Sequence, residues 1–154
     1  MSRPVHRHKR FLALVAVGGA LGTALRELLS LLVPAIDGVA VVIVGINLLG
    51  ALALGVLLEA LVRSGPDEGR RRAIRLFVGT GVLGGFTTYS TLAVTTAGLL
   101  GEGRAAVGLG YALGSVILGA LATTLGIVIG GAWHRRARVA APSNQPARST
   151  GERG

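Results

Sequence analysis

The sequence contains no cysteine, few aromatic residues and few acids. The lack of cysteine excludes disulfides and thiolate metal sites. Aromatic residues make up 4% of the 154 residues, whereas 25 residues are glycine. A soluble domain needs large side chains to fill its core, but apolar runs rich in glycine and alanine suit helices that pack closely in lipid. The composition therefore favours a membrane protein.

The acids are outnumbered by bases, and the formal net charge is +9. Such a balance is also typical of nucleic-acid-binding proteins. Here, however, the basic residues lie in short clusters between long apolar runs, which is the pattern of a membrane protein. We therefore expect these basic residues to lie beside the lipid bilayer, and we expect no nucleic acid as a partner.

Four apolar runs are long enough to cross the bilayer. They span about 11–33, 39–62, 75–100 and 106–132. About 20 helical residues cross the hydrocarbon layer, and backbone groups in lipid must be satisfied internally, so helices are expected. A signal peptide is an alternative interpretation of the N-terminus, but its apolar run is longer than a signal sequence needs. The sequence predicts an all-α membrane protein with four transmembrane helices.

Short polar segments flank and connect these runs. We expect a basic tail over 1–10, a membrane domain over 11–133 and a basic, disordered tail over 134–154. With four crossings, both tails and the second loop lie on one side. That side holds fourteen of the sixteen Lys and Arg residues: Arg3, Arg7, Lys9, Arg10, Arg63, Arg70, Arg71, Arg72, Arg75, Arg135, Arg136, Arg138, Arg148 and Arg153. The positive-inside rule therefore predicts cytoplasmic termini in the cell membrane.

Pairs of glycines four residues apart recur in the expected helices. They are Gly18/Gly22, Gly110/Gly114 and Gly126/Gly130. Such pairs let helix backbones approach closely. Glycine-rich helices also generate this spacing by chance, so the pairs indicate possible contacts only.

Few polar residues lie within the first two expected helices, and Arg26 and Asn47 stand out among them. Polar residues within the membrane are costly and therefore become functional candidates. Arg26 is either a structural cation or part of an ion pathway. Asn47 offers N–H donors either to an anion or to a neighbouring helix.

The third apolar run contains the least helix-compatible segment. It reads GTGVLGGFTTYST over 79–91, and its glycines and threonines weaken a helix. A break there frees backbone carbonyls, which often coordinate ions at membrane depth. Thr88, Thr91 and Thr95 then form one hydroxyl face. The alternative is that these hydroxyls bond back to their own helix.

No catalytic constellation lies within the expected spans. Serine–histidine–acid sets, paired carboxylates and histidine clusters are all missing from them. The glycine-rich stretches contain no P-loop lysine, which argues against nucleotide binding. We therefore predict that the chain is not an enzyme.

Three collinear motifs together resemble the CrcB/Fluc family of fluoride channels. They read GGALGTALR in the first run, NLLG in the second and GVLGGFTTYSTL in the third. The resemblance covers all four spans. It implies an antiparallel dimer of four-helix subunits with a broken third helix, which passes fluoride passively out of the cell.

The resemblance also assigns roles to individual residues. Asn47 and Arg26 match ion-pathway positions, and Ser90 and Thr91 match pore-lining hydroxyls. Tyr89 and Leu92 match two phenylalanines whose ring edges face the anion in the family; Leu92 lacks a ring. The backbone carbonyls of Gly84 and Thr87 match the ligands of a structural sodium ion at the dimer centre.

The uneven charge leads to an expectation about the dimer. An antiparallel homodimer requires one sequence to insert both ways, and therefore a nearly balanced charge. We expect a fixed orientation and an oppositely oriented paralogue as partner, with a homodimer as the alternative. A small proton-coupled drug exporter and a non-conducting partner subunit are competing interpretations. The exporter needs a central carboxylate, and the deep acid available is Glu27, beside Arg26.

Overall fold

The described part of the chain, residues 9–139, forms seven helical segments in this computed structural model. Three are long helices: α1 (Lys9–Leu32), α2 (Val41–Arg63) and α6 (Ala105–Val139). All three are long and apolar enough to cross a membrane, α6 through Trp133. The remaining parts of the predicted tails, 1–8 and 140–154, lie outside the described residues.

The last helix is longer than the sequence predicts. We expected it to end near 132 and to give way to a disordered tail from 134. Instead α6 continues to Val139. The segment 134–139 contains no glycine or proline to stop the helix, so the helix extends into the first residues of the predicted tail.

The third apolar run and the basic residues just before it form four helical segments. They are α3 (Gly69–Ile74), a π-helix η2 (Arg75–Leu83), α4 (Gly84–Phe86) and α5 (Ser90–Gly101). The helix is interrupted between Phe86 and Ser90, within the glycine- and threonine-rich stretch. The sequence predicts the break, but not the π-helix before it.

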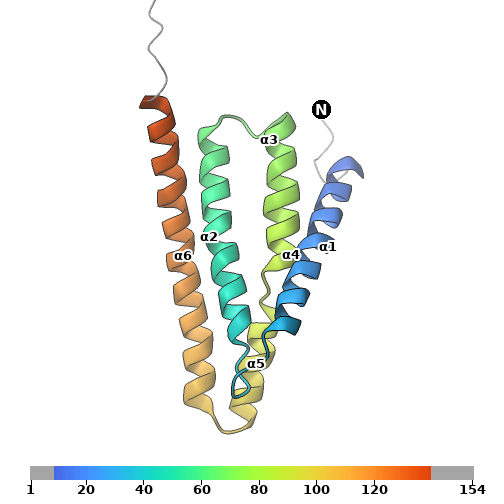
Figure 1. Ribbon diagram of the computed structural model, residues 1–154, viewed down its shortest axis with the longest axis vertical. Coiled ribbons are helices and arrows are strands. Elements are labelled where there is room, and N and C mark those ends of the chain that lie inside the picture. Colours follow the sequence, from blue (N-terminus) through green and yellow to red (C-terminus); the bar gives the residue numbers. More distant parts are fainter. Residues whose placement is uncertain (1–8, 140–154) are drawn as a thin grey trace, which may run out of the picture.

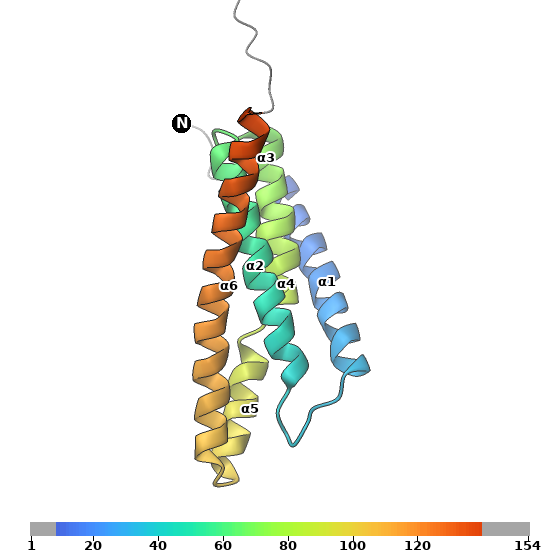
Figure 2. The ribbon, with the colours of Figure 1, turned by 60° about the vertical axis from the view of Figure 1, so that its left-hand side comes forward.

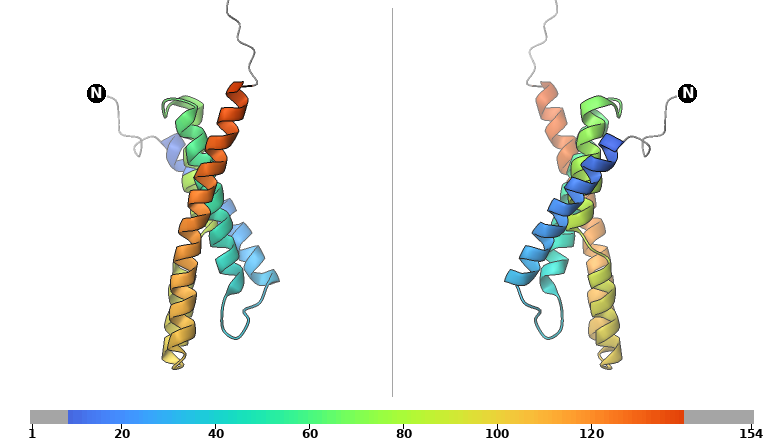
Figure 3. Two further views of the ribbon diagram at one scale, coloured as in Figure 1. Left: turned by 90° about the vertical axis from the view of Figure 1, so that its left-hand side faces the viewer. Right: turned by 90° about the vertical axis from the view of Figure 1, so that its right-hand side faces the viewer.

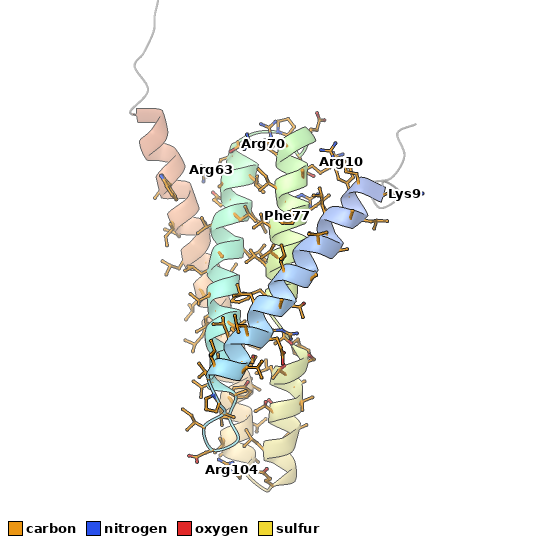
Figure 4. The ribbon with its side chains drawn as sticks, turned by 45° about the vertical axis from the view of Figure 1, so that its right-hand side comes forward. Lys9, Arg10, Arg63, Arg70, Phe77 and Arg104 are labelled. Carbon is orange, nitrogen blue, oxygen red and sulfur yellow. The ribbon has the colours of Figure 1, made fainter. Side chains whose placement is uncertain are left out.

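Four stretches of the chain run in alternating directions, as Figure 1 shows: α1, α2, the stretch from α3 to α5, and α6. The first residues of α1, the α2–α3 connection and the end of α6 lie at one end. Lys9, Arg10, Arg63 and Arg70 lie at this end, which we call the basic end, and Arg104 lies at the other (Figure 4). Helix α2 packs against α6, and α5 lies beside the first half of α6 (Figure 2). The structure thus separates the charges as expected.

Glycines bring α1 against η2 and α4. A Cβ on Gly18 would collide with the carbonyl oxygen of Phe77, and one on Gly22 with that of Val82. On the opposite side, a Cβ on Gly85 would collide with the carbonyl oxygen of Gly19. Because the backbones touch here, even alanine does not fit.

The other two glycine pairs behave differently from each other. Gly126 lies against the backbone of Leu52 on α2, and Gly130 lies against Val56 and Glu59. In contrast, Gly110 and Gly114 have no neighbour within 4 Å of the place where a Cβ would stand. Two of the three pairs therefore mark contacts within this chain.

The buried core is small for a chain of this length. Among the described residues, the buried large side chains are Ile43, Ile46, Phe86, Leu92 and Leu99, and no charged or polar side chain is buried. Many leucines, valines and isoleucines are exposed along all the long helices. Such a surface is suited to lipid and to a packed partner, not to water. The chain is an all-α membrane protein.

An arginine connects the two loops at the end away from the basic end. The α1–α2 connection turns at Asp37 and Gly38, which both have positive φ, and backbone hydrogen bonds between Ile36 and Val39 close the turn. Figure 3 shows this turn and the α5–α6 turn apart from each other. Arg104 Nη1 spans the gap and donates to the Asp37 carbonyl at 2.8 Å.

Adjacent glycines on α1 provide a matched test of this packing. We expect Gly18→Ala to lower the free energy of unfolding by about 1–3 kcal/mol, because the new methyl meets backbone that cannot rotate away. Gly19→Ala meets nothing within 4 Å and should be neutral or stabilising by up to about 1 kcal/mol. Thermal unfolding in detergent measures both. Equal effects of the two substitutions would contradict the close approach of α1 and η2.

Candidate functional site

The break in the third span lies at Thr87, Thr88 and Tyr89. Thr87 leaves the helical region, with φ −79° and ψ 153°, and Tyr89 returns to it, with φ −92° and ψ −30°. The Thr87 hydroxyl helps to end the helix before the break, because Thr87 Oγ1 donates to the Leu83 carbonyl at 2.8 Å. The chain thus makes one extended step before α5 begins.

Asn47 on α2 holds this step through two hydrogen bonds. Its Oδ1 accepts from the backbone N–H of Thr88 at 2.8 Å, and its Nδ2 donates to the Thr88 carbonyl at 2.9 Å. The side-chain amide therefore takes the place of a backbone partner for both polar groups of one residue. We call this pair of bonds the Asn47–Thr88 clamp.

The spacing of the NLLG motif has a physical reason. Gly50 lies one helical turn after Asn47 and faces the break as well. A Cβ on Gly50 would collide with the Cγ2 methyl of Thr87. The asparagine therefore binds the break, while the glycine makes room for it.

The clamp changes the surroundings of two backbone carbonyls. In an uninterrupted helix the N–H of Thr88 would bond to the carbonyl of Gly84, but here it bonds to Asn47. The extended ψ of Thr87 turns its own carbonyl out of the helical direction. Gly84 is exposed, with nothing within 4 Å of its Cβ position. Carbonyl oxygens in such a setting are suitable ligands for a hard cation.

The predicted hydroxyl face differs from the other hydroxyls of the bundle. Seven hydroxyls of the described residues bond back to a carbonyl four residues earlier: Ser30, Ser64, Thr87, Thr96, Ser115, Thr123 and Thr124. Within residues 9–139 no such bond occurs at Thr88, Thr91 or Thr95. Thr88 Oγ1 instead lies 3.0 Å from Ser90 Oγ. Thr88 is thus paired with Ser90, and Thr95 lies against the Tyr111 hydroxyl, so among residues 9–139 Thr91 is the member of this face whose hydroxyl stays available to another partner.

Arg26 and Thr91 line a cavity of about 260 Å³ between α1, α5 and the start of α2. Glu27 and Ser30 line it as well. The Nε of Arg26 is buried and has no hydrogen-bond partner in the described part of the chain. The cavity therefore brings the Arg26 guanidinium, with its unused Nε–H donor, near the hydroxyl of Thr91 in the predicted ion pathway. This placement is compatible with both roles that the sequence allowed for Arg26.

Tyr89 and Leu92 lie on another side of the break. Both line a groove of about 380 Å³ between α5 and α6. The Tyr89 side chain is 77% exposed, whereas Leu92 is 7% exposed. Within one subunit, Tyr89 is therefore free to meet an ion or a partner, and Leu92 belongs to the helix packing.

The structure thus divides the predicted site residues into three groups. Asn47 and Ser90 both contact Thr88 at the break, Arg26 shares a cavity with Thr91, and Tyr89 shares a groove with Leu92. Sequence reasoning missed Tyr111, whose hydroxyl is buried beside the Thr95 hydroxyl of the predicted face. Its position near the beginning of the fourth run, at the end away from the basic end, indicated an interfacial aromatic residue instead.

The chain matches a known protein family over most of its length. Residues 13–127 match the family described as CrcB-like protein, Camphor Resistance (CrcB). The chain is 53% identical over 131 residues to "Fluoride-specific ion channel FluC 2" of Leifsonia xyli subsp. xyli, covering 85% of this chain and 90% of the relative. It is 47% identical over 116 residues to "Fluoride-specific ion channel FluC 1" of Cutibacterium acnes, covering 75% and 81%.

A more distant relative matches over a similar length. The chain is 39% identical over 118 residues to "Fluoride-specific ion channel FluC" of Aquifex aeolicus, covering 75% of this chain and 93% of the relative. The matched region of the family includes most of α1, the clamp, the break and most of α6. The chain belongs to the CrcB family of membrane proteins, which is a family of ion channels and not of enzymes.

Proposed function

We propose that this chain is a subunit of a fluoride-selective channel that lowers cytoplasmic fluoride by passive efflux. The observation that carries the proposal is the Asn47–Thr88 clamp at a break in a transmembrane helix. Irregular backbone at membrane depth is tolerated where it is buried in protein or lines a water-filled cavity. The names of the relatives supply the identity of the ion.

The direction of transport follows from the membrane potential. Moving one elementary charge across the membrane is worth about 2.3 kcal/mol per 100 mV. An inside-negative potential therefore drives a monovalent anion outward without coupling to another substrate. Passive efflux needs no central titratable carboxylate, whereas a proton-coupled exporter does, and this difference separates the two functions.

The polar groups around the break supply an anion pathway. The Asn47 amide uses one of its two N–H bonds on Thr88 and keeps the other for an anion. Ser90 and Thr91 add hydroxyl donors, and Arg26 adds a positive charge with a buried, unused Nε–H. Tyr89 presents a ring whose edge carries partial positive charge. These groups attract an anion without trapping it in a charged cage.

The unpartnered surfaces support an antiparallel dimer. Gly84, Gly110 and Gly114 have no neighbour at their Cβ positions within the chain. Two carbonyls, those of Gly84 and Thr87, are too few to complete the shell of a cation. A second subunit would double their number, and a structural sodium ion at the dimer centre fits this requirement.

The charge distribution supports a fixed orientation with cytoplasmic termini. Five arginines lie at the basic end from Arg63 to Arg75, against Arg104 at the other end. An oppositely oriented paralogue therefore fits the second position of the dimer better than an inverted copy does. This partner would also supply the ring that Leu92 lacks.

Fluoride efflux from proteoliposomes tests the function. We expect efflux when the chain is reconstituted with an oppositely oriented paralogue, and little when it is reconstituted alone. Asn47→Leu should abolish efflux of the pair, because it removes both the clamp and the spare donor. No efflux under either condition would contradict the channel, and efflux from the chain alone, inserted both ways, would contradict the unequal pair.

Sodium replacement tests the central cation. Exchanging sodium for N-methyl-glucamine on both sides should reduce efflux and dimer stability, and sodium should restore both. Thr87→Val keeps the backbone carbonyl and should keep the sodium dependence, because the proposed ligand is not the hydroxyl. Efflux and dimer stability that do not depend on sodium would show that the carbonyls hold no such ion.

A further inference from the structure

A second cavity lies at the basic end, away from the break. It has a volume of about 290 Å³ between the end of α2, the α2–α3 connection and the beginning of η2. Its lining combines three apolar side chains, Leu58, Leu61 and Val62, with Gly65, and three charged ones, Asp67, Arg71 and Arg75. None of these residues belongs to the proposed ion pathway.

The apolar part of the cavity faces the hydrocarbon. Val62 is 74% exposed and Leu58 is 39% exposed. Leu58 lies about 7.5 Å along the helix axis from Arg63, the last residue of α2, at 1.5 Å per residue. The floor of the cavity is therefore at the depth of the first acyl carbons, and its rim is at the depth of the lipid headgroups.

The guanidinium groups at the rim are held in place. Arg71 donates from Nε to the Pro66 carbonyl and from Nη1 to the Ser64 carbonyl, both at 2.8 Å. Arg75 binds Asp67 in a two-point pair, with Nε at 3.0 Å from Oδ1 and Nη2 at 2.8 Å from Oδ2. The hydrogen bonds of residues 9–139 leave Arg71 Nη2 and Arg75 Nη1 unused.

The single acid at the rim is already neutralised. Its hydrogen bonds with Arg75, together with the charges of Arg75 and Arg72, hold the pKa of Asp67 below its ordinary value, against the opposing effect of burial. The carboxylate is thus ionised and paired at neutral pH. The two arginines together exceed it by one positive charge, so the rim retains an attraction for an anion.

We propose that this cavity binds the phosphate of an anionic phospholipid, with the beginning of an acyl chain against Leu58, Leu61 and Val62. A phosphate oxygen matches the two unused guanidinium donors in charge and in hydrogen-bonding chemistry. Clusters of basic residues beside a transmembrane helix attract anionic lipids. A free phosphate would use the rim but leave the apolar floor uncovered, which is why the lipid is the better occupant.

Lipid titration followed by native mass spectrometry tests the site on the full chain. Phosphatidylglycerol should bind to protein in non-ionic detergent at least tenfold more tightly than phosphatidylcholine. The double substitution Arg71→Gln and Arg75→Gln should weaken phosphatidylglycerol binding by about tenfold or more, as expected for lost hydrogen bonds to a charged group. Arg70→Gln is the matched control, because Arg70 carries the same charge in α3 but does not line the cavity. It should change binding less than twofold.

The same titration contains the results that would overturn the site. An equal loss with Arg70→Gln would show diffuse attraction to the basic end, and equal binding of phosphatidylcholine would remove the role of charge. Equal binding of glycerol 3-phosphate would show a site for a soluble phosphate. Val62→Trp fills the apolar floor and leaves the arginines in place, so it should also weaken binding. This variant decides the question if the double variant does not fold.

Discussion

The two hydrogen bonds between Asn47 and Thr88 are the interaction on which the rest of the site depends. A transmembrane helix that stops at Thr87 and restarts at Ser90 leaves backbone polar groups without helical partners, at a cost of several kcal/mol each in hydrocarbon. The side-chain amide satisfies one donor and one acceptor of the same residue. It thereby ties α2 to the break and takes the N–H of Thr88 away from the Gly84 carbonyl, while the extended ψ of Thr87 turns that residue's own carbonyl out of the helical direction.

Glycines make this arrangement possible by letting backbones touch. Gly50 admits the methyl of Thr87 beside the clamp, and Gly18, Gly22 and Gly85 bring α1 against the segment before the break. Within lipid, such contacts gain van der Waals packing without a hydrophobic driving force. The large exposed apolar surface that remains is left for lipid and for a second subunit. Function therefore depends on close packing around a small polar centre.

Much of this could be predicted from the sequence. Four apolar runs predict the spans, the glycines and threonines of 79–91 predict the break, and the family motifs predict Asn47 and Thr87 as site residues. The π-helix over 75–83 was missed because hydrogen-bond register depends on tertiary contacts that periodicity does not report. The clamp partner was also missed, because an amide in the membrane fits a helix, an ion or a broken backbone equally well until Thr88 is placed beside it.

Amide hydrogen exchange at Thr88 tests the central claim most directly. The wild-type chain in detergent is compared with Asn47→Leu, which has a similar volume but no hydrogen-bonding group. Loss of the bond to Oδ1 should speed exchange across 87–89 by about tenfold or more, and exchange in α6 should not change. Equal exchange in the two proteins would contradict the account, since it would mean that Thr88 is protected by a partner other than Asn47.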